Sequence, residues 1–318
     1  MFRDGGHRAG EAECLNILGH ALAATGEPRA ALERFAEATV ILEGLHARSM
    51  LATVASNQGV TSGELGEYAQ ALAYYDRALE LHRAAGNRVG EAITLNNTGT
   101  VYSALAEYQK ALEAFRAGLD IHRALGRQHD IAVNLHNVAW VRATLRDAAR
   151  ARTLYLEALA IWRKVGDRSS LSNTLSNLGE TWTALGEPVK ARAAHEEALA
   201  LRRAVGDRDG EASSLTQLAT ALAKAGERER ARESFERAVE LLRSTGNRRK
   251  LAGTLRALGE AEQSAEALRE SLEISRALRD RRSEASALTA LARLSRARGD
   301  REEAHGFARA ALEVFEEL

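Results

Sequence analysis

Residue types that mark several common classes of protein are scarce in this chain of 318 residues. Its single cysteine, Cys14, excludes a disulfide framework and a zinc site built from cysteines. The 44 basic and 44 acidic side chains cancel, so no net charge points to nucleic acid or to an anionic membrane. No apolar run approaches the roughly 18 residues that cross a bilayer, and the N-terminus has no signal-peptide core. These absences predict a soluble, cytoplasmic protein that does not associate with membranes.

Proline and aromatic residues are scarce as well. The chain has only 2 prolines and 5% aromatic residues, beside 45% hydrophobic and 28% charged residues. This mixture is typical of helices that pack through small side chains. It predicts a nearly all-helical protein.

The sequence repeats itself with a period of about 40 residues, and a period of this length determines how the rest is interpreted. A shift by one period aligns residues 95–99 with 135–139, 175–179 and 215–219. A second block keeps the same phase, and it begins with Ala31, Ala71, Ala111, Ala151, Ala191 and Ala231. An aromatic residue follows each of these alanines four positions later, except in the repeat that has His195 there.

Each period has the pattern of two helices. In the third repeat two sets of apolar residues fit two successive helical faces, and they are Leu95, Val101, Tyr102 and Leu105, then Leu112, Phe115, Leu119 and Ile121. Glycine followed by Asn or Asp, as in Gly86-Asn87, supplies a left-handed helix end and a cap for the next helix. Pro28 and Pro188 fall near the first position of a helix, where a missing N–H is tolerated. The pattern predicts antiparallel helix pairs.

The spacing of Leu95, Gly99, Tyr102, Ala111 and Phe115 resembles that of the tetratricopeptide repeat in its 40-residue form, the branch of kinesin light chains. The resemblance covers essentially the whole chain. It implies an all-α fold, a right-handed superhelical α-solenoid of about eight antiparallel helix pairs. Gly99 and Ala111 would let paired helices approach closely, while Tyr102 and Phe115 would fill the space beside them.

We expect a single solenoid over residues 1–318, with repeats at about 8–45, 48–85, 88–125, 128–165, 168–205, 208–245, a shortened 248–278, and 281–316. The seventh repeat lacks seven residues between Gly259 and Ser271, which predicts a shortened hairpin rather than one continuous helix. Residues 1–10 align with the end of a second helix, so we expect a segment of a longer protein. A short natural protein with frayed termini is the alternative.

Catalytic motifs are absent from the sequence. It contains no phosphate-binding loop, no dinucleotide-binding G-x-G-x-x-G after a strand and no H-E-x-x-H pair. Cys14 is expected to be a packed thiol. His82, His122, Trp162 and Arg202 recur late in successive second helices and are expected at a solvated edge. The sequence predicts no enzyme, no cofactor and no metal site.

A polar row is the most informative feature of the first helices. The row, which we call the amide row, consists of Asn57, Asn97, Asn137, Asn177 and Gln217. The resemblance places it on the concave face and implies that it holds the backbone of a peptide, as asparagine ladders do in this branch. A carboxamide suits that role because it both donates and accepts. The alternative is that these amides bond to a neighbouring helix and only order the stack.

Residues beside the amide row vary from repeat to repeat and are candidates for setting specificity. They are Asn16, Asn96 and His136 one place before a row position, and Trp140 and Glu180 three places after one. Trp140 is expected to be an aromatic anchor for a ligand or a partly buried packing residue, and the sequence does not decide between these roles.

Basic residues cluster in two turns near the shortened repeat, at Arg248, Arg249 and Lys250 and at Arg281 and Arg282. A solvated turn is favoured over a site for an acidic partner or for nucleic acid. No interleaved aromatic residues offer stacking surfaces for bases. We therefore do not expect nucleic acid to be the partner.

These observations predict a protein–protein interaction module that binds a peptide or a partner protein in its concave groove. The resemblance further implies the sensory or regulatory arm of a larger bacterial signalling or transcriptional regulator, with an effector domain attached in the full-length protein. The alternative is a structural or self-associating scaffold without a peptide ligand.

Overall fold

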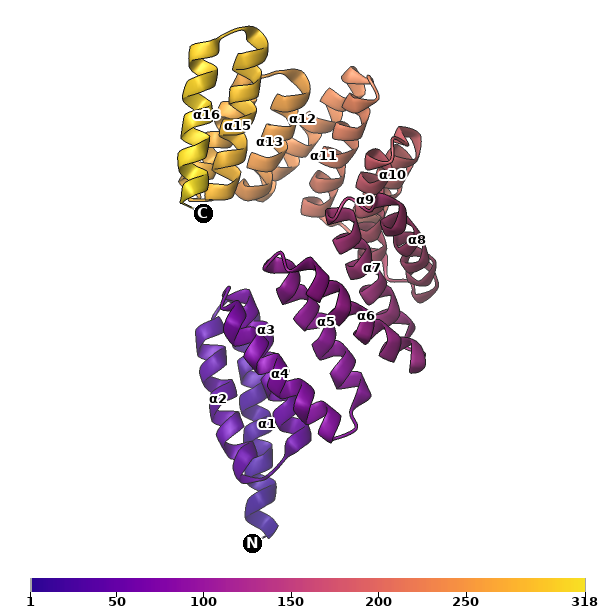
Figure 1. The fold of residues 1–318 in the computed structure, drawn as a ribbon, viewed down its shortest axis with the longest axis vertical. Coiled ribbons are helices and arrows are strands. Elements are labelled where there is room, and N and C mark those ends of the chain that lie inside the picture. The colour runs from indigo at the N-terminus through magenta and orange to yellow at the C-terminus, as the bar shows by residue number, and fades with distance from the viewer. Residues whose placement is uncertain (1, 318) are drawn as a thin grey trace. The chain divides into compact units, whose positions relative to one another are not determined.

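The computed structural model describes residues 2–317, with side chains from residue 7 onwards, and shows sixteen α-helices and no strand among them (Figure 1). The all-α prediction is confirmed. The first eight helices are α1 (Phe2–Ala24), α2 (Pro28–Gly44), α3 (Arg48–Glu64), α4 (Tyr68–Ala84), α5 (Arg88–Ala104), α6 (Tyr108–Ala124), α7 (Gln128–Thr144) and α8 (Ala148–Val165). The others are α9 (Arg168–Ala184), α10 (Pro188–Ala204), α11 (Arg208–Lys224), α12 (Arg228–Thr245), α13 (Arg248–Glu262), α14 (Ala265–Ala277), α15 (Arg281–Arg298) and α16 (Arg301–Glu316).

The chain divides into two compact units, residues 1–161 and 162–318. The boundary lies within α8, so the first unit contains α1–α7 and most of α8, and the second contains α9–α16. In each unit the helices follow one another in pairs, such as α3 with α4 and α11 with α12.

Helix ends lie where the punctuation of the sequence predicts them. Gly86 ends the fourth helix with a φ of 65°, and the Asn87 side chain then accepts a hydrogen bond from the Gly90 amide at 2.9 Å. The same arrangement recurs at Gly166 and Gly206, each followed by a capping aspartate. Glycine serves at these ends because it adopts a positive φ without steric cost.

Close approach within a helix pair is confirmed at Gly99. A Cβ atom on Gly99 would lie 2.7 Å from Cδ1 of Phe115, so the aromatic ring occupies the space that glycine leaves. Gly59 and Tyr75 make the same contact in the preceding repeat. Glycine on one helix thus lets an aromatic residue on its partner lie directly against the backbone.

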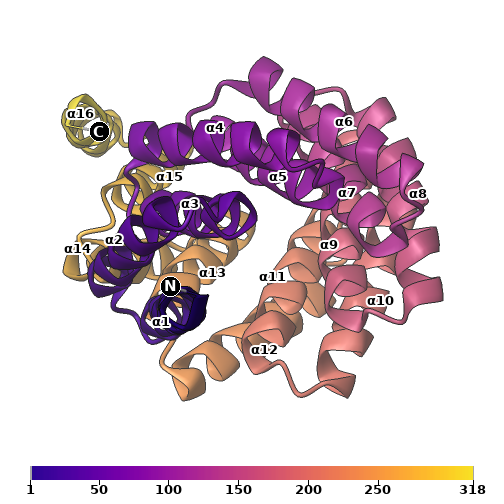
Figure 2. The ribbon, with the colours of Figure 1, turned by 90° about the horizontal axis from the view of Figure 1, so that it is seen from below.

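First helices of neighbouring repeats lie closer together than second helices do. Within the first unit α3 approaches both α1 and α5, and within the second unit α11 approaches both α9 and α13. No comparable approach joins α2 to α4 or α10 to α12 among the described residues, and Figure 2 shows α3 and α5 on the same side of α4. Each unit is therefore curved, with its first helices forming the inner layer.

The seventh pair, α13 and α14, is a shortened hairpin, as the missing residues predict. These helices have 15 and 13 residues, whereas α9 and α10 have 17 each. Gln263 ends α13 with a φ of 56°, and Ser264 caps α14 through its side chain. The chain reverses in these two residues, which excludes the alternative of one continuous helix.

Two expectations about buried residues are wrong. His82, His122, Trp162 and Arg202 are buried rather than solvated, with exposed fractions between 1% and 7%. His82 packs against Gly90, and Arg202 packs against Gly210, in each case in the first turn of the next helix. Cys14, in contrast, is exposed. Its equivalent Val54 packs in the core beside α2, but no helix precedes α1 among the described residues to cover Cys14.

Candidate binding face

All five members of the amide row are half-buried on first helices. Asn57, Asn97 and Asn137 lie on α3, α5 and α7 of the first unit. Asn177 and Gln217 lie on α9 and α11 of the second unit. The row therefore belongs to the inner layer of each unit.

Two members of the amide row bond to the preceding repeat. The Asn57 side-chain amide donates to Oδ1 of Asn16 at 2.8 Å, and that of Asn137 donates to Oδ1 of Asn96 at 2.9 Å. The acceptors are two of the residues proposed above to set specificity. These carboxamides link neighbouring first helices, as the alternative interpretation of the row requires.

Asn97 differs from its neighbours because it makes no hydrogen bond through its side chain to any described residue. The equivalent acceptor position in the preceding repeat is Ser56, whose side chain is shorter than asparagine and instead bonds to the Thr94 hydroxyl at 3.1 Å. Asn97 is half-buried all the same. Its carboxamide therefore keeps its full capacity to donate and accept.

In the second unit Gln217 donates from its side-chain amide to Oε1 of Glu180 at 2.9 Å. Glu180 is exposed on α9, and this bond brings a row member together with one of the predicted specificity residues. The longer glutamine side chain thus finds a different partner from the asparagines of the first unit.

His136 and Trp140 lie on α7 and differ in exposure. The His136 ring is half-buried and packs edge-to-face with the Tyr155 ring, at 5.5 Å between ring centroids and an interplanar angle of 69°. Burial lowers the pKa of His136 to about 4, so the ring is neutral near pH 7. Trp140 is 40% exposed. Of the two, Trp140 offers apolar surface to solvent on the first-helix face.

Arg202 is a residue whose importance the sequence analysis missed. Its guanidinium is buried and donates to the Gly210 carbonyl at 3.1 Å, to the Ser214 hydroxyl at 2.6 Å and to Oδ1 of Asn173 at 2.8 Å. Burial lowers the pKa of Arg202, and nearby Asp207 partly opposes this effect. The sequence did hold a signal, because Arg202 is the only arginine in the row that it forms with His82, His122 and Trp162.

The basic turns are partly neutralised by the chain itself. Lys250 Nζ lies 3.9 Å from a carboxylate oxygen of Asp209, and Arg281 contacts Glu284 at 2.8 Å. Arg248 and Arg282 make no ion pair with any described residue. The turns therefore carry less free charge than their sequence indicates.

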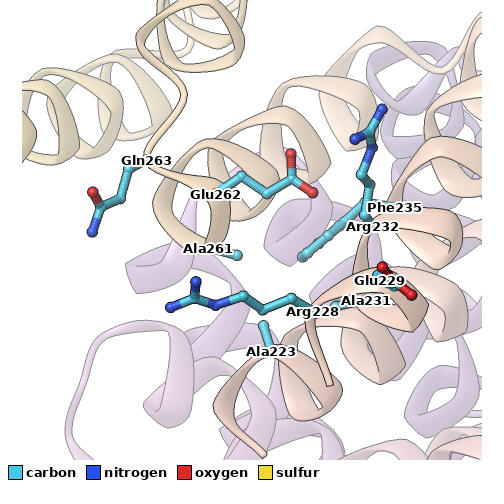
Figure 3. Close-up of a pocket in the computed structure, with 9 residues that line it drawn as sticks. All are labelled: Ala223, Arg228, Glu229, Ala231, Arg232, Phe235, Ala261, Glu262 and Gln263. Carbon is cyan, nitrogen blue, oxygen red and sulfur yellow. The ribbon is translucent and has the colours of Figure 1, made fainter. Parts of the chain in front are cut away.

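A cavity of about 390 Å³ lies at the tip of the shortened hairpin (Figure 3). Its apolar lining includes Phe235, and charged side chains surround it, among them Arg228 and Glu262. Figure 3 shows Glu262 directed towards Phe235 and Gln263 directed away from it. The cavity lies beside the end of α13, at the tip where the hairpin lacks seven residues.

The described part of the chain contains neither a cluster of metal ligands nor a membrane-spanning helix. No group of three or more His, Cys, Asp or Glu side chains is arranged to hold a metal ion. No described helix combines the length and apolarity needed to cross a membrane.

The helix pairs and their 40-residue phase agree with a family model. The model of the tetratricopeptide repeat matches residues 50–124, 130–204, 170–244 and 246–317. The chain belongs to the tetratricopeptide repeat family. Domains of this family mediate protein interactions. A comparison with curated protein sequences gave no match.

Several solved tetratricopeptide repeat structures share the fold. The apo form of the quorum sensor NprR from B. thuringiensis has a TM-score of 0.73 at 15% identity, over 96% of this chain and 87% of that chain. A Rap protein complexed with competence and sporulation factor has a TM-score of 0.68 at 14% identity, over 99% and 98%. A signal transduction ATPase with a tetratricopeptide repeat sensor, from Pyrococcus horikoshii, has a TM-score of 0.66 at 16% identity, over 96% of this chain and 48% of that one.

Proposed function

We propose that this tetratricopeptide repeat protein is an interaction module whose first-helix face binds a peptide or an extended segment of a partner protein. The observation that supports the proposal most directly is the half-buried Asn97 carboxamide, which has no partner within the described chain. An unpaired polar group that is partly shielded from water gains most from a ligand that supplies its missing hydrogen bonds.

The chemistry of the face suits peptide backbone. A carboxamide pairs with both the N–H and the C=O of an extended chain, without reading its side chains. Asn57 and Asn137 each donate one side-chain N–H to the preceding repeat. The second N–H and the carbonyl oxygen of each carboxamide are left for a ligand. Trp140, on the same face of the first unit, supplies an apolar anchor for one ligand side chain.

The wider role that we propose is the sensory or regulatory arm of a cytoplasmic bacterial regulator, with an effector domain elsewhere in the full-length protein. The support is the shared fold of NprR, described as a quorum sensor, and of a signal transduction ATPase with a repeat sensor. In this role the chain binds and does not catalyse. The flanking gene sequence tests the effector domain directly, since it either encodes such a domain or does not.

The binding proposal is tested by selecting ligands from a displayed peptide library on the wild-type protein. Selected peptides are then measured by fluorescence polarisation against Asn97→Ala and Trp140→Ala. Each variant is expected to weaken binding at least tenfold with an unchanged circular dichroism spectrum, because hot-spot positions carry most of the binding energy. Gln109→Ala, on the second helix α6, is the matched control and is expected to bind like the wild type. Equal affinity of all three variants would place the ligand elsewhere and refute the proposal.

The second candidate function is a scaffold that orders or joins helical stacks without a peptide ligand. The hydrogen bonds from Asn57 to Asn16 and from Asn137 to Asn96 favour it, because they occupy part of the amide row within the chain. Self-association predicts a molar mass in light scattering that falls on dilution. A constant monomer mass removes that form of the candidate.

A further inference from the structure

A groove lined by arginine side chains lies among α6, α7 and α8 of the first unit. Its volume is about 650 Å³, within the roughly 300–1,000 Å³ of ligand sites in proteins. We call it the arginine groove, and its charged lining consists of Arg116, Arg123, Arg142, Arg150 and Arg152 with the single carboxylate of Asp120. Nothing in the amide row or in the proposed peptide site accounts for it.

Carboxylates of the chain neutralise part of this charge. Arg123 contacts Glu157 at 2.8 Å. Arg142 and Arg150 both contact the same oxygen of Asp147, at 3.6 and 3.1 Å, so one carboxylate serves two guanidinium groups. The groove keeps an excess of positive charge.

Arg116 is the clearest unpaired cation in the groove. It is exposed on α6 and makes no ion pair with any described residue. Arg150 is exposed too, with 71% of its side chain open to solvent. Exposed guanidinium groups with few partners are available for a ligand that brings carboxylates.

An equivalent groove lies three repeats later in the chain, and its lining is mainly acidic. A cavity of about 460 Å³ among α12, α13 and α14 is lined by Glu236, Glu240, Glu266 and Glu270, with Arg243 as its only basic residue. Arg116 corresponds to Glu236, which lines this second groove. The helix arrangement alone therefore does not require arginines, and their concentration in the first unit is a property of that one groove.

The floor of the arginine groove decides which anionic partner fits. Leu119 and Val138, which are buried, and Leu154 form the apolar part of its lining, and we call the arginines of α6 and those of α8 its two rims. None of the described residues that line it is aromatic, so bases of a nucleic acid find no stacking surface there. From Arg116 to Arg123 the rim extends for about 10 Å along α6, roughly two helical turns. An amphipathic helix with carboxylates on both sides of an apolar stripe matches this floor and these rims.

We propose that the arginine groove binds an acidic, amphipathic helical segment of a partner protein. Guanidinium groups on the rims pair with Asp and Glu side chains, and the apolar stripe of the segment covers Leu119, Val138 and Leu154. The site is separate from the amide row, so the chain has a second interaction surface besides the one proposed for peptides.

The test uses a fluorescein-labelled helical peptide of about 14 residues, roughly four turns, built from Leu, Ala and Glu with the leucines along one stripe. Fluorescence polarisation with the full chain is expected to give saturable binding that weakens as salt is raised. Arg116→Glu combined with Arg150→Glu is expected to weaken binding at least tenfold, and Arg116→Gln alone about threefold. Both positions are exposed, and thermal melting checks that the variants fold like the wild type.

The matched control is Arg248→Glu combined with Arg282→Glu, which changes the net charge by the same amount on exposed, unpaired residues of the second unit. It is expected to retain wild-type affinity. Equal weakening by both double variants would mean general electrostatic attraction and would overturn the proposal. So would equal affinity for a peptide with serine in place of leucine, since the apolar floor would then be unused. If a single-stranded oligonucleotide bound more tightly than the helical peptide, and Arg116→Glu with Arg150→Glu abolished that binding, the groove would be assigned to nucleic acid instead.

Discussion

The side-chain amide of Asn137 donates to Oδ1 of Asn96 at 2.9 Å, so a member of the amide row is held by the residue that precedes the row in the previous repeat. Asn16 holds Asn57 in the same way. Ser56 stands at the equivalent position before Asn97, has a shorter side chain and bonds to the Thr94 hydroxyl instead. One side chain in the preceding repeat thus decides whether a row member is engaged within the chain or left for a ligand.

This difference predicts unequal contributions of the row to stability. Asn137→Ala removes a hydrogen bond between half-buried groups and is expected to lower the free energy of unfolding by about 1 kcal/mol. Asn97→Ala removes none and is expected to change it by less than about 0.5 kcal/mol. Urea denaturation followed by circular dichroism measures both, and equal losses would contradict the assignment of partners.

Ser56→Asn is expected to convert Asn97 into an engaged member of the row. The new asparagine supplies the acceptor that Asn16 and Asn96 supply elsewhere. Affinity for a peptide that depends on Asn97 should then fall several-fold, although Asn97 itself is unchanged. Isothermal titration with a selected peptide measures the effect, and Ser56→Ala is the control that adds no acceptor.

Gly99→Ala is expected to lower the free energy of unfolding by about 1–3 kcal/mol, because the added methyl group overlaps the Phe115 ring. Gly253→Ala is the matched control on α13. No atom lies within 4 Å of its would-be Cβ, so alanine should stabilise the helix by up to about 1 kcal/mol. Opposite signs in thermal melting support the packing argument, and two destabilised variants would contradict it.

Arg202→Ala is expected to lower the free energy of unfolding by about 2–4 kcal/mol. The substitution leaves a buried space and removes the guanidinium that donates to the Ser214 hydroxyl and the Gly210 carbonyl. Arg202→Leu is expected to cost less than about 1.5 kcal/mol. Leu242 fills the equivalent position one repeat later and is 1% exposed, so the fold accommodates an apolar residue there. Chemical denaturation separates the two, and equal losses would show that the hydrogen bonds rather than the packing dominate.

The lowered pKa of His195 predicts that the protein loses stability in mild acid. Burial, assisted by nearby Arg202, lowers its pKa to about 4 from 6.5. Between these values the unfolded chain binds a proton that the folded chain does not, so stability is full above pH 6.5 and falls as the pH drops towards 4. His195→Phe should remove about 1–3 kcal/mol of the difference in stability between pH 8 and pH 4.5. An unchanged difference would mean that other groups, such as buried His82 and His122, account for it.

Much of the fold could be predicted from the sequence because its signals are local and repeated. Gly86-Asn87 fixes a helix end and a cap through backbone conformation and one side chain, and both are visible without tertiary information. The glycine–aromatic pair of Gly99 and Phe115 is separated by a constant 16 residues, so phase alone brings the two residues together.

The site was less predictable, because burial and partner choice depend on neighbouring repeats. His82 and His122 were expected at a solvated edge, but both are buried beside the first turn of the following helix, His82 against Gly90 and His122 near Asp130. The asparagine row is visible in the sequence. Which of its members has a partner within the chain is not, because that depends on how far a side chain in the previous repeat reaches. The arginine groove was missed for a related reason, since its residues come from three helices and form no run along the chain.

The shortened seventh pair also indicates where the chain can be engineered. The seven missing residues belong to the hairpin tip, because α13 is two residues shorter than α9, α14 is four shorter than α10, and the turn between them is one residue shorter. Because the residues are missing only from the two helix ends that meet at the tip, the rest of α13 and α14 keeps its place beside the neighbouring repeats. The tip at Gln263 and Ser264 is therefore the natural place to graft a reporter loop, because length there is free to vary without disturbing the rest of the array.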